Sequence, residues 1–189
     1  MQFIKTRDVK DPVRDVKENA GIDFFIPENT ADFAKAFKEK NKEAVVGDVA
    51  DLREFRDETG RDWPDVYYNT SSGVITISPQ CAVIIPTGIK SKFGPELALI
   101  ANNKSGIATK KQLIFGASVI DCSYQGEWHI NLINTSKNFQ TLECGQKAVQ
   151  FIPHLISTDP VEIVDMTEEE FYTEKTSRGD GWQGSTGVK

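Results

Sequence analysis

The sequence is poor in the residues that build disulfide frameworks, zinc cages and membrane spans. Its 189 residues include 3 Cys, none of them in a Cys-x-x-Cys pair, and 2 His, which argues against a zinc site and indicates reduced thiols. No apolar run approaches the roughly 20 residues that cross a bilayer, and the opening segment has no apolar stretch typical of a secretory signal. These absences favour a cytoplasmic protein without a membrane segment.

Positive charge is also in deficit. The chain has 22 Lys and Arg against 28 Asp and Glu, a formal net charge of −6. Stable nucleic-acid binding needs a basic face for the phosphates, so we do not expect it. A few local cations could still hold a small anionic ligand. Hydrophobic residues make up 39% of the chain, which is enough for a packed core.

Most of the sequence has the pattern of short strands. Apolar and β-branched runs of four to eight or so residues alternate with turn residues, which favours an all-β barrel or sandwich over repeated strand–helix–strand units. The runs cover residues 21–27, 73–78, 81–89, 96–102, 127–134 and 148–156.

Residues 28–72 break this pattern, because they are charged and show helical spacing. The apolar residues of 31–41 fall on one face, and 48–60 has Asp48 as a plausible N-cap and Gly60 as a stop. We predict an insertion of one or two helices between two strands. The alternative is a long ordered loop.

These features predict a single β domain over residues 1–173, interrupted by the charged helical insertion. Residues 174–189 are polar and rich in Gly, which is typical of a flexible terminal arm. The arm nevertheless carries Arg178 and Trp182, whose side chains are suited to binding a ligand.

The densest chemical segment is 117–134. Asp121 follows an apolar strand end, where a carboxylate can act as a general base on water, and Tyr124 is placed to lie under a sugar ring. An ordinary turn aspartate is the alternative for Asp121. Earlier in the chain, Lys104 precedes the small residues Ser105 and Gly106, a pattern that suits phosphate but also a plain turn.

Five short segments in order give these residues a common meaning. Together they resemble the five motifs of the homotrimeric dUTP pyrophosphatase (dUTPase) family, and the resemblance extends from Ala20 to Gly187 except for the insertion. The segments are AGID (20–23), KSGIA (104–108), VIDCSYQG (119–126), GQKAVQ (145–150) and RGDGWQGSTG (178–187).

The resemblance implies a jelly-roll-like β-barrel and a homotrimer whose active sites are shared between subunits. It implies Mg²⁺-dependent hydrolysis of dUTP to dUMP and pyrophosphate, which keeps uracil out of DNA and supplies dUMP for dTTP synthesis. The Mg²⁺ ion would be held mainly by the substrate phosphates and water. By similarity, Asp121 would activate the attacking water, Tyr124 would pack under the deoxyribose, and the strand around Ser118 would read uracil.

The remaining site residues are also assigned by the resemblance. Ser105, Gly106 and Gln150 would hold the phosphate chain with the help of Lys104, and Asp23 would support the metal–phosphate region or pair with the arm. The arm would close over the nucleotide and supply Arg178, Trp182, Gln183, Gly184, Ser185 and Thr186.

The sequence departs from the family pattern at three of these positions. Lys104 stands where Arg is usual, so a planar fork becomes a point charge. Ser118 stands where Gly is usual, which narrows the uracil slot. Gln183 stands where an aromatic residue is expected to stack on uracil, and Trp182 lies one position earlier.

Two alternatives remain. A dCTP deaminase shares the fold, but Gly106 replaces its second Ser and Asn131 stands where its catalytic Glu is expected. A nucleotide-dependent regulatory or binding protein could use residues 28–72 as a partner surface, although such a protein needs no catalytic base.

The arm yields the first prediction. Cutting the chain after Lys175 should leave the assembly intact while dUTP turnover falls steeply, because Arg178, Ser185 and Thr186 are removed. Pyrophosphate release and sedimentation measure the two effects. Normal turnover by the truncated protein would show that the arm does not take part.

Overall fold

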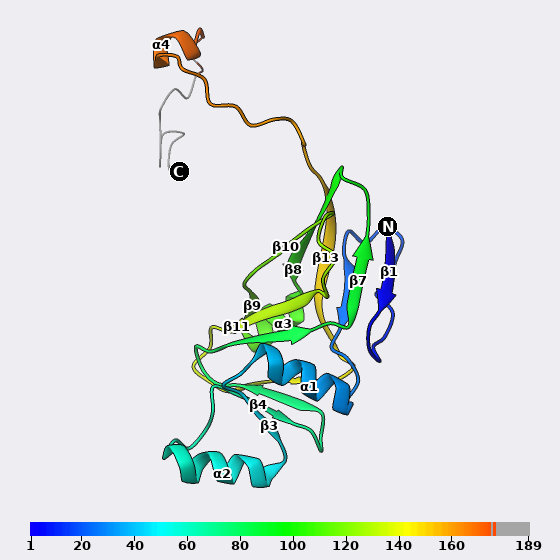
Figure 1. Cartoon of the computed structure of the whole chain (residues 1–189), viewed down its shortest axis with the longest axis vertical. Helices are drawn as coiled ribbons and strands as arrows, with labels where there is room; N and C mark the ends of the chain where they lie inside the picture. The colour runs from blue at the N-terminus through cyan, green and yellow to red at the C-terminus, as the bar shows by residue number, and fades with distance from the viewer. Residues whose placement is uncertain (175, 177–189) are drawn as a thin grey trace. The chain divides into compact units, whose positions relative to one another are not determined.

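The computed structural model describes residues 1–174 and 176, in one compact unit over Met1–Ser157 and a second that begins at Thr158. Within the described residues, strands dominate and the helices are few (Figure 1). The expected all-β fold is therefore confirmed.

The strands are β1 Gln2–Lys5, β2 Ile22–Phe25, β3 Val45–Gly47, β4 Val66–Asn69, β5 Val74–Ile77, β6 Ala82–Pro86, β7 Ile89–Lys92, β8 Leu97–Asn103, β9 Leu113–Phe115, β10 Val119–Asp121, β11 His129–Asn134, β12 Gln140–Glu143 and β13 Lys147–Leu155. The helices are α1 Ala31–Lys40, α2 Val49–Thr59, α3 Ser105–Lys111 and α4 Glu168–Phe171.

The strands form several small sheets rather than one continuous sheet. Their orders are β1-β7, β10-β8-β13-β2, β6-β11-β9 and β12-β5-β4-β3. Neighbours run antiparallel, except for β3 and β4, which are parallel. The sheet β10-β8-β13-β2 carries Asp23, Asp121 and Gln150, and its register fixes their spacing.

The six strands predicted from apolar and β-branched runs all exist, as β2, β5, β6, β8, β11 and β13. Shorter strands such as β9 and β10 were not predicted separately, because three residues are fewer than the runs that indicate a strand. Residues 105–111 form α3, where a turn was the preferred expectation.

Residues 28–72 contain both expected helices and two strands besides. The Asp48 side chain caps α2 within a reciprocal capping box, and Gly60 ends it in the left-handed region at φ 68°. These are the start and stop predicted from the sequence. β3 and β4 join the sheet of β5 and β12, so the segment also extends a sheet.

Helix α1 packs into the main core. The Thr30 hydroxyl accepts from the Phe33 amide at 3.2 Å and caps the helix. The rings of Phe33 and Phe37 are fully buried and lie 5.3 and 5.2 Å from the ring of Tyr68 on β4. Outside the segment, the Asn41 side chain at the end of α1 donates to the Ile84 carbonyl of β6 at 2.7 Å, so the helix is also joined to the β domain.

An aromatic cluster fills the core beneath the site-bearing sheet. The rings of Phe24 on β2 and Trp128 stack 5.1 Å apart, and Phe151 on β13 lies 4.9 Å from Phe24. All three residues are buried. Because β2 and β13 are held by this cluster, the polar residues on the same strands occupy fixed positions.

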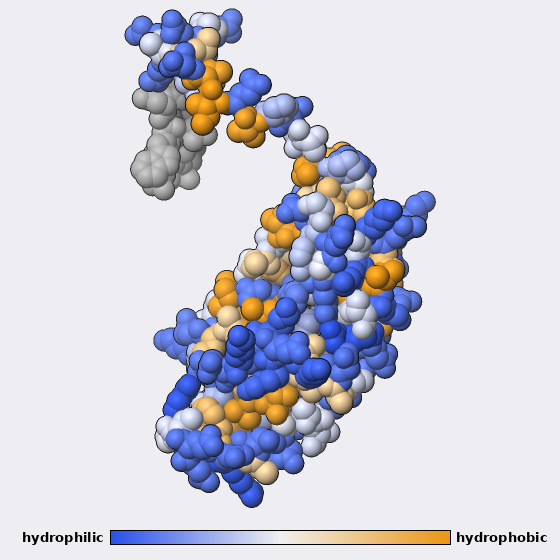
Figure 2. All heavy atoms as spheres, viewed as in Figure 1, coloured by the Kyte–Doolittle hydropathy of each residue, from blue (hydrophilic) through white to orange (hydrophobic). Residues whose placement is uncertain are grey.

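The second unit begins as an extended segment and reaches α4, whose N-cap Thr167 and Glu170 form a capping box. Val161 and Ile163 are almost fully exposed, and Figure 2 shows apolar residues along this segment. Among the described residues, every helix is too short or too polar to cross a bilayer.

The packing of α1 yields the second prediction. Phe37→Ala should lower the free energy of unfolding by about 3 to 5 kcal/mol, because it empties a fully buried ring site. Lys35→Ala, on the exposed side of the same helix, should change it by less than about 0.5 kcal/mol. Urea unfolding at one fixed protein concentration measures both. Equal effects would show that α1 is not part of the core.

Candidate active site

Asp23 lies at the centre of a cluster of charges. It pairs with Gln150 of β13 in the sheet register, and its side chain is 12% exposed. One carboxylate oxygen accepts from Lys104 Nζ at 2.5 Å, and the other lies 3.0 Å from Lys147 Nζ. Burial alone would raise the pKa of Asp23, but the two lysines outweigh it and hold the pKa below its ordinary value.

Lys147 belongs to the same cluster and was not singled out from the sequence. It also forms an ion pair with Asp15, and the hydrogen bonds to Asp15 and Asp23 raise its pKa. The feature of the sequence that could have identified Lys147 is its position within GQKAVQ, the fourth motif. Two ammonium groups therefore meet at Asp23, for which the resemblance implied support of the metal–phosphate region or a pair with Arg178.

Lys104 is also the residue from which α3 begins. Ser105 and Gly106 form the first turn of α3, and both are exposed. A side chain built at Gly106 would meet nothing within 4 Å. Because the first amides of a helix have no partner within it, the turn presents N–H groups to solvent beside the Lys104 ammonium, an arrangement that suits an anion.

Gln150 closes this cluster on the β13 side. Its Nε2 donates to the carbonyl of Asn103, just before Lys104, at 3.3 Å. A Cβ built at Gly21 would lie 2.4 Å from Gln150 Oε1, so the Gly of AGID allows the amide to approach the backbone. The structure thus brings Asp23, Lys104 and Gln150 together, from three separate motifs.

Asp121 and Tyr124 form a second group. Asp121 is exposed at the end of β10, opposite Ala98 of β8, and its carbonyl accepts from the Tyr124 amide at 3.1 Å. The Tyr124 ring is 41% exposed. Ser118 is half-buried, and its carbonyl accepts from Ala101 N–H at 2.7 Å.

One chain does not bring the two groups together. Asp23 lies on β2 at one edge of the sheet, opposite Gln150 and then Asn102, whereas Asp121 lies on β10 at the other edge, opposite Ala98. With strands about 4.8 Å apart and a rise of about 3.3 Å per residue, Asp121 and Asp23 are on the order of 20 Å apart. Each group by itself is half of the expected site.

The remaining predicted residues cannot be placed. Arg178, Trp182, Gln183, Gly184, Ser185 and Thr186 lie outside the described residues. Among the described residues, no group of three or more His, Cys, Asp or Glu is placed to hold a metal ion.

Comparisons with known proteins agree with the motifs. The dUTPase family profile matches residues 67–187. The chain is 32% identical over 117 residues to the deoxyuridine 5′-triphosphate nucleotidohydrolase of Arabidopsis thaliana, a region covering 61% of each protein and thus less than two thirds of that relative. The protein of the same name from Haemophilus ducreyi is 30% identical over 153 residues, 72% of this chain and 95% of that one.

The fold is also similar to that of a solved structure. The Staphylococcus bacteriophage 80alpha dUTPase with dUPNHPP superposes with a TM-score of 0.67 at 18% identity, covering 99% of this chain and 98% of that one. The expected dUTPase-like β fold is confirmed by this likeness. Because the family profile spans more than half of the sequence, this chain belongs to the dUTPase family.

Proposed function

We propose that the protein hydrolyses dUTP to dUMP and pyrophosphate with Mg²⁺, and so limits uracil in DNA and supplies dUMP for dTTP synthesis. The observation that carries the proposal is the meeting of Asp23, Lys104 and Gln150 beside the open first turn of α3. These residues come from three motifs of the family to which the chain belongs, and their donors suit a triphosphate.

The active site is assembled from more than one copy of the chain. Asp121 and Asp23 of one chain are too far apart for a single bound dUTP. Its α-phosphorus would have to lie near Asp121 while its phosphate chain contacted the residues around Asp23 and Lys104. A homotrimer with three shared sites resolves this distance, because Asp121 of one chain can face the Lys104 group of another.

Asp121 acts as the general base. Its carboxylate is exposed and free to accept a proton from a water aligned with the α-phosphorus. Tyr124 lies one turn further on, where its ring packs under the deoxyribose and leaves no room for a 2′-hydroxyl. Ser118, directly before β10, lines the uracil slot.

The phosphate chain is held by Lys104, Ser105, Gly106 and Gln150. Lys147 adds a second ammonium group beside that of Lys104. Both oxygens of Asp23 are engaged by lysines, so Asp23 orients these cations rather than binding a metal directly. Mg²⁺ would then be held by phosphate oxygens and water, since both oxygens of Asp23 are already occupied by ammonium groups. When bound, it neutralises charge on the leaving pyrophosphate. Arg178, Ser185 and Thr186 complete the grip on the γ-phosphate, and Trp182, Gln183 and Gly184 cover the base.

The side chain of Asn131 argues against deamination. Its Oδ1 accepts from the Ala117 amide at 3.3 Å, next to Ser118, which is where a deaminase would need a carboxylate to move protons. The side-chain amide of Asn neither takes up nor releases a proton as a general acid or base near neutral pH, although its NH₂ group can donate hydrogen bonds. The site therefore favours hydrolysis at phosphorus.

Asp121 yields the third prediction. Asp121→Asn should keep the fold and bind nucleotide, yet lose on the order of 10² to 10⁴ in kcat, because an amide cannot take the proton. Pyrophosphate release from dUTP measures kcat, and calorimetric titration with a non-hydrolysable analogue measures binding. Asp57→Asn, on the exposed surface of α2, serves as the control. Turnover at the parental rate would refute the assignment of the base.

The shared site yields the fourth prediction. Asp121→Asn and Lys104→Ala should each be nearly inactive alone, but refolding them together should restore activity. With random assortment into trimers, about a quarter of the sites receive an intact Asp121 and an intact Lys104 from different chains. If mixing restores nothing, both residues act within one chain and the shared-site model is wrong.

A further inference from the structure

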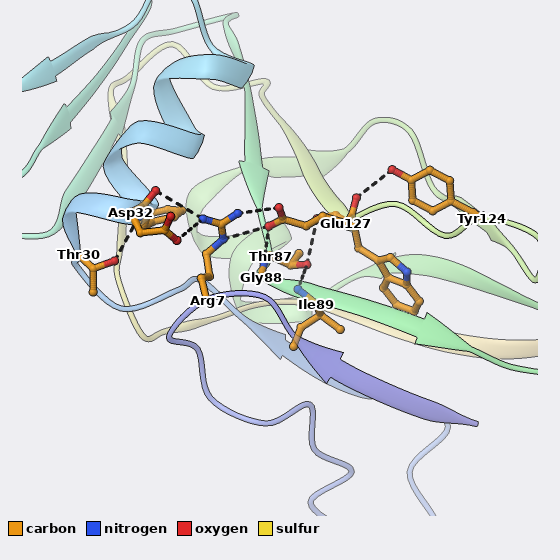
Figure 3. A network of polar contacts seen from close by, with 10 residues as sticks. Arg7, Thr30, Asp32, Thr87, Gly88, Ile89, Tyr124 and Glu127 are labelled. Atoms are coloured by element: carbon orange, nitrogen blue, oxygen red, sulfur yellow. Dashed lines mark hydrogen bonds and ion pairs between the residues drawn. The ribbon is translucent and has the colours of Figure 1, made fainter.

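A mostly buried ion pair between Arg7 and Glu127 lies beside the turn that carries Tyr124 (Figure 3). The Glu127 carboxylate accepts from Nε and Nη2 of Arg7 at 3.1 and 2.7 Å, and from the amide of Gly88 at 2.6 Å. The side chains of Arg7 and Glu127 are 8% and 18% exposed. Two-pronged hydrogen bonds between charged groups are the strongest and most directional in proteins, so the position of Glu127 is tightly defined.

The backbone of Glu127 is in turn what holds Tyr124. The Tyr124 hydroxyl donates to the Glu127 carbonyl at 2.9 Å, and the ring lies so close to Gly126 that a Cβ there would be 2.3 Å from the hydroxyl oxygen. On the other side, the Trp128 amide donates to the carbonyl of Ile89 at 2.9 Å. Glu127 therefore joins the exposed ring to the rigid part of the sheet.

The backbone at Gly88 is shaped to fit this ion pair. Gly88 has φ +71°, and a Cβ built there would lie 2.4 Å from Cγ of Arg7. A side chain at this position would be strained and would push Arg7 away. The adjacent Thr87 hydroxyl donates to the Trp128 carbonyl at 2.9 Å. The loop between β6 and β7 thus holds Arg7, Glu127 and Trp128 in one arrangement.

We infer that Glu127, held by Arg7 and the Gly88 amide, is a positioning residue for Tyr124 and sets how strictly the site excludes a 2′-hydroxyl. The inference rests on the proposed function, since it assigns to Tyr124 the place under the sugar. A ring rejects an extra hydroxyl by steric conflict only if it cannot move aside. Loosening Glu127 should therefore relax the choice between dUTP and UTP more than it slows dUTP hydrolysis.

The test compares kcat/KM for dUTP and UTP in the parent, Glu127→Gln, Tyr124→Phe and the double variant. Gln cannot accept both Arg7 nitrogens and the Gly88 amide, and Phe cannot bond to the Glu127 carbonyl. The matched control is Asp32→Asn. This variant removes the ion pair between Asp32 Oδ2 and Arg7, which lie 2.7 Å apart. The Asp32 side chain is 66% exposed, and the change leaves Glu127 in place.

Glu127→Gln and Tyr124→Phe should each lower the preference for dUTP, measured as kcat/KM for dUTP divided by kcat/KM for UTP, about tenfold. A loss of this size is expected when one hydrogen bond that holds the ring is removed. The double variant should lower the preference no further, because both changes break one connection. Asp32→Asn should keep the parental ratio. An unchanged ratio in Glu127→Gln, or fully multiplicative losses in the double variant, would overturn the inference.

Hydrogen exchange decides the same point without turnover. In Glu127→Gln, amides of residues 122–128 should exchange faster than in the parent, whereas peptides from β8 and β13 should not change. Uniformly faster exchange would mean that the pair is merely structural and would overturn the inference. A parent that fails to hydrolyse dUTP would contradict the proposed function instead, and the exchange pattern would still show whether Glu127 holds the Tyr124 turn.

Discussion

The candidate site depends on one nearly buried carboxylate. Asp23 can remain charged on β2 only because Lys104 and Lys147 approach its two oxygens, since an isolated buried charge would be expensive. In meeting that requirement, Asp23 brings the N-cap residue of α3 and the first residue of β13 to the same point. The protein thereby gathers two ammonium groups and a helix start in one place despite its net charge of −6. Under the proposed function, a triphosphate uses those cations, which Asp23 has already positioned.

The sheet register then explains why this cluster is incomplete alone. Antiparallel pairing fixes Asp23 and Asp121 at opposite edges, four residues apart along β8, and side chains cannot cover that separation. Under the proposed function, assembly is part of the chemistry, because the base and the phosphate cradle come from different chains. The core cluster of Phe24, Trp128 and Phe151 keeps each half rigid enough to meet its partner.

The sequence predicted what local patterns determine. Apolar and β-branched runs located six strands. Asp48 and Gly60 marked both ends of α2, because capping acts through neighbouring residues. α3 was missed, since Gly106 and the absence of a side-chain cap conceal a helix of seven residues. The pair of Arg7 and Glu127 was out of reach for another reason: its partners are 120 positions apart, and only the folded β6–β7 loop brings them together. The motif order revealed the family, but not which residues share one chain's cluster.

Arg7 illustrates how differently two ion pairs of one side chain can act. Its contact with Asp32 is exposed on one side, so water and salt screen it and its contribution to stability is small. Its contact with Glu127 is shielded on both sides, where the cost of desolvation offsets much of the attraction. A buried pair of this kind adds little net stability over apolar packing, but it permits only one geometry. Because that geometry ends at the Tyr124 hydroxyl, the pair is better suited to fixing the proposed sugar site than to holding the fold together.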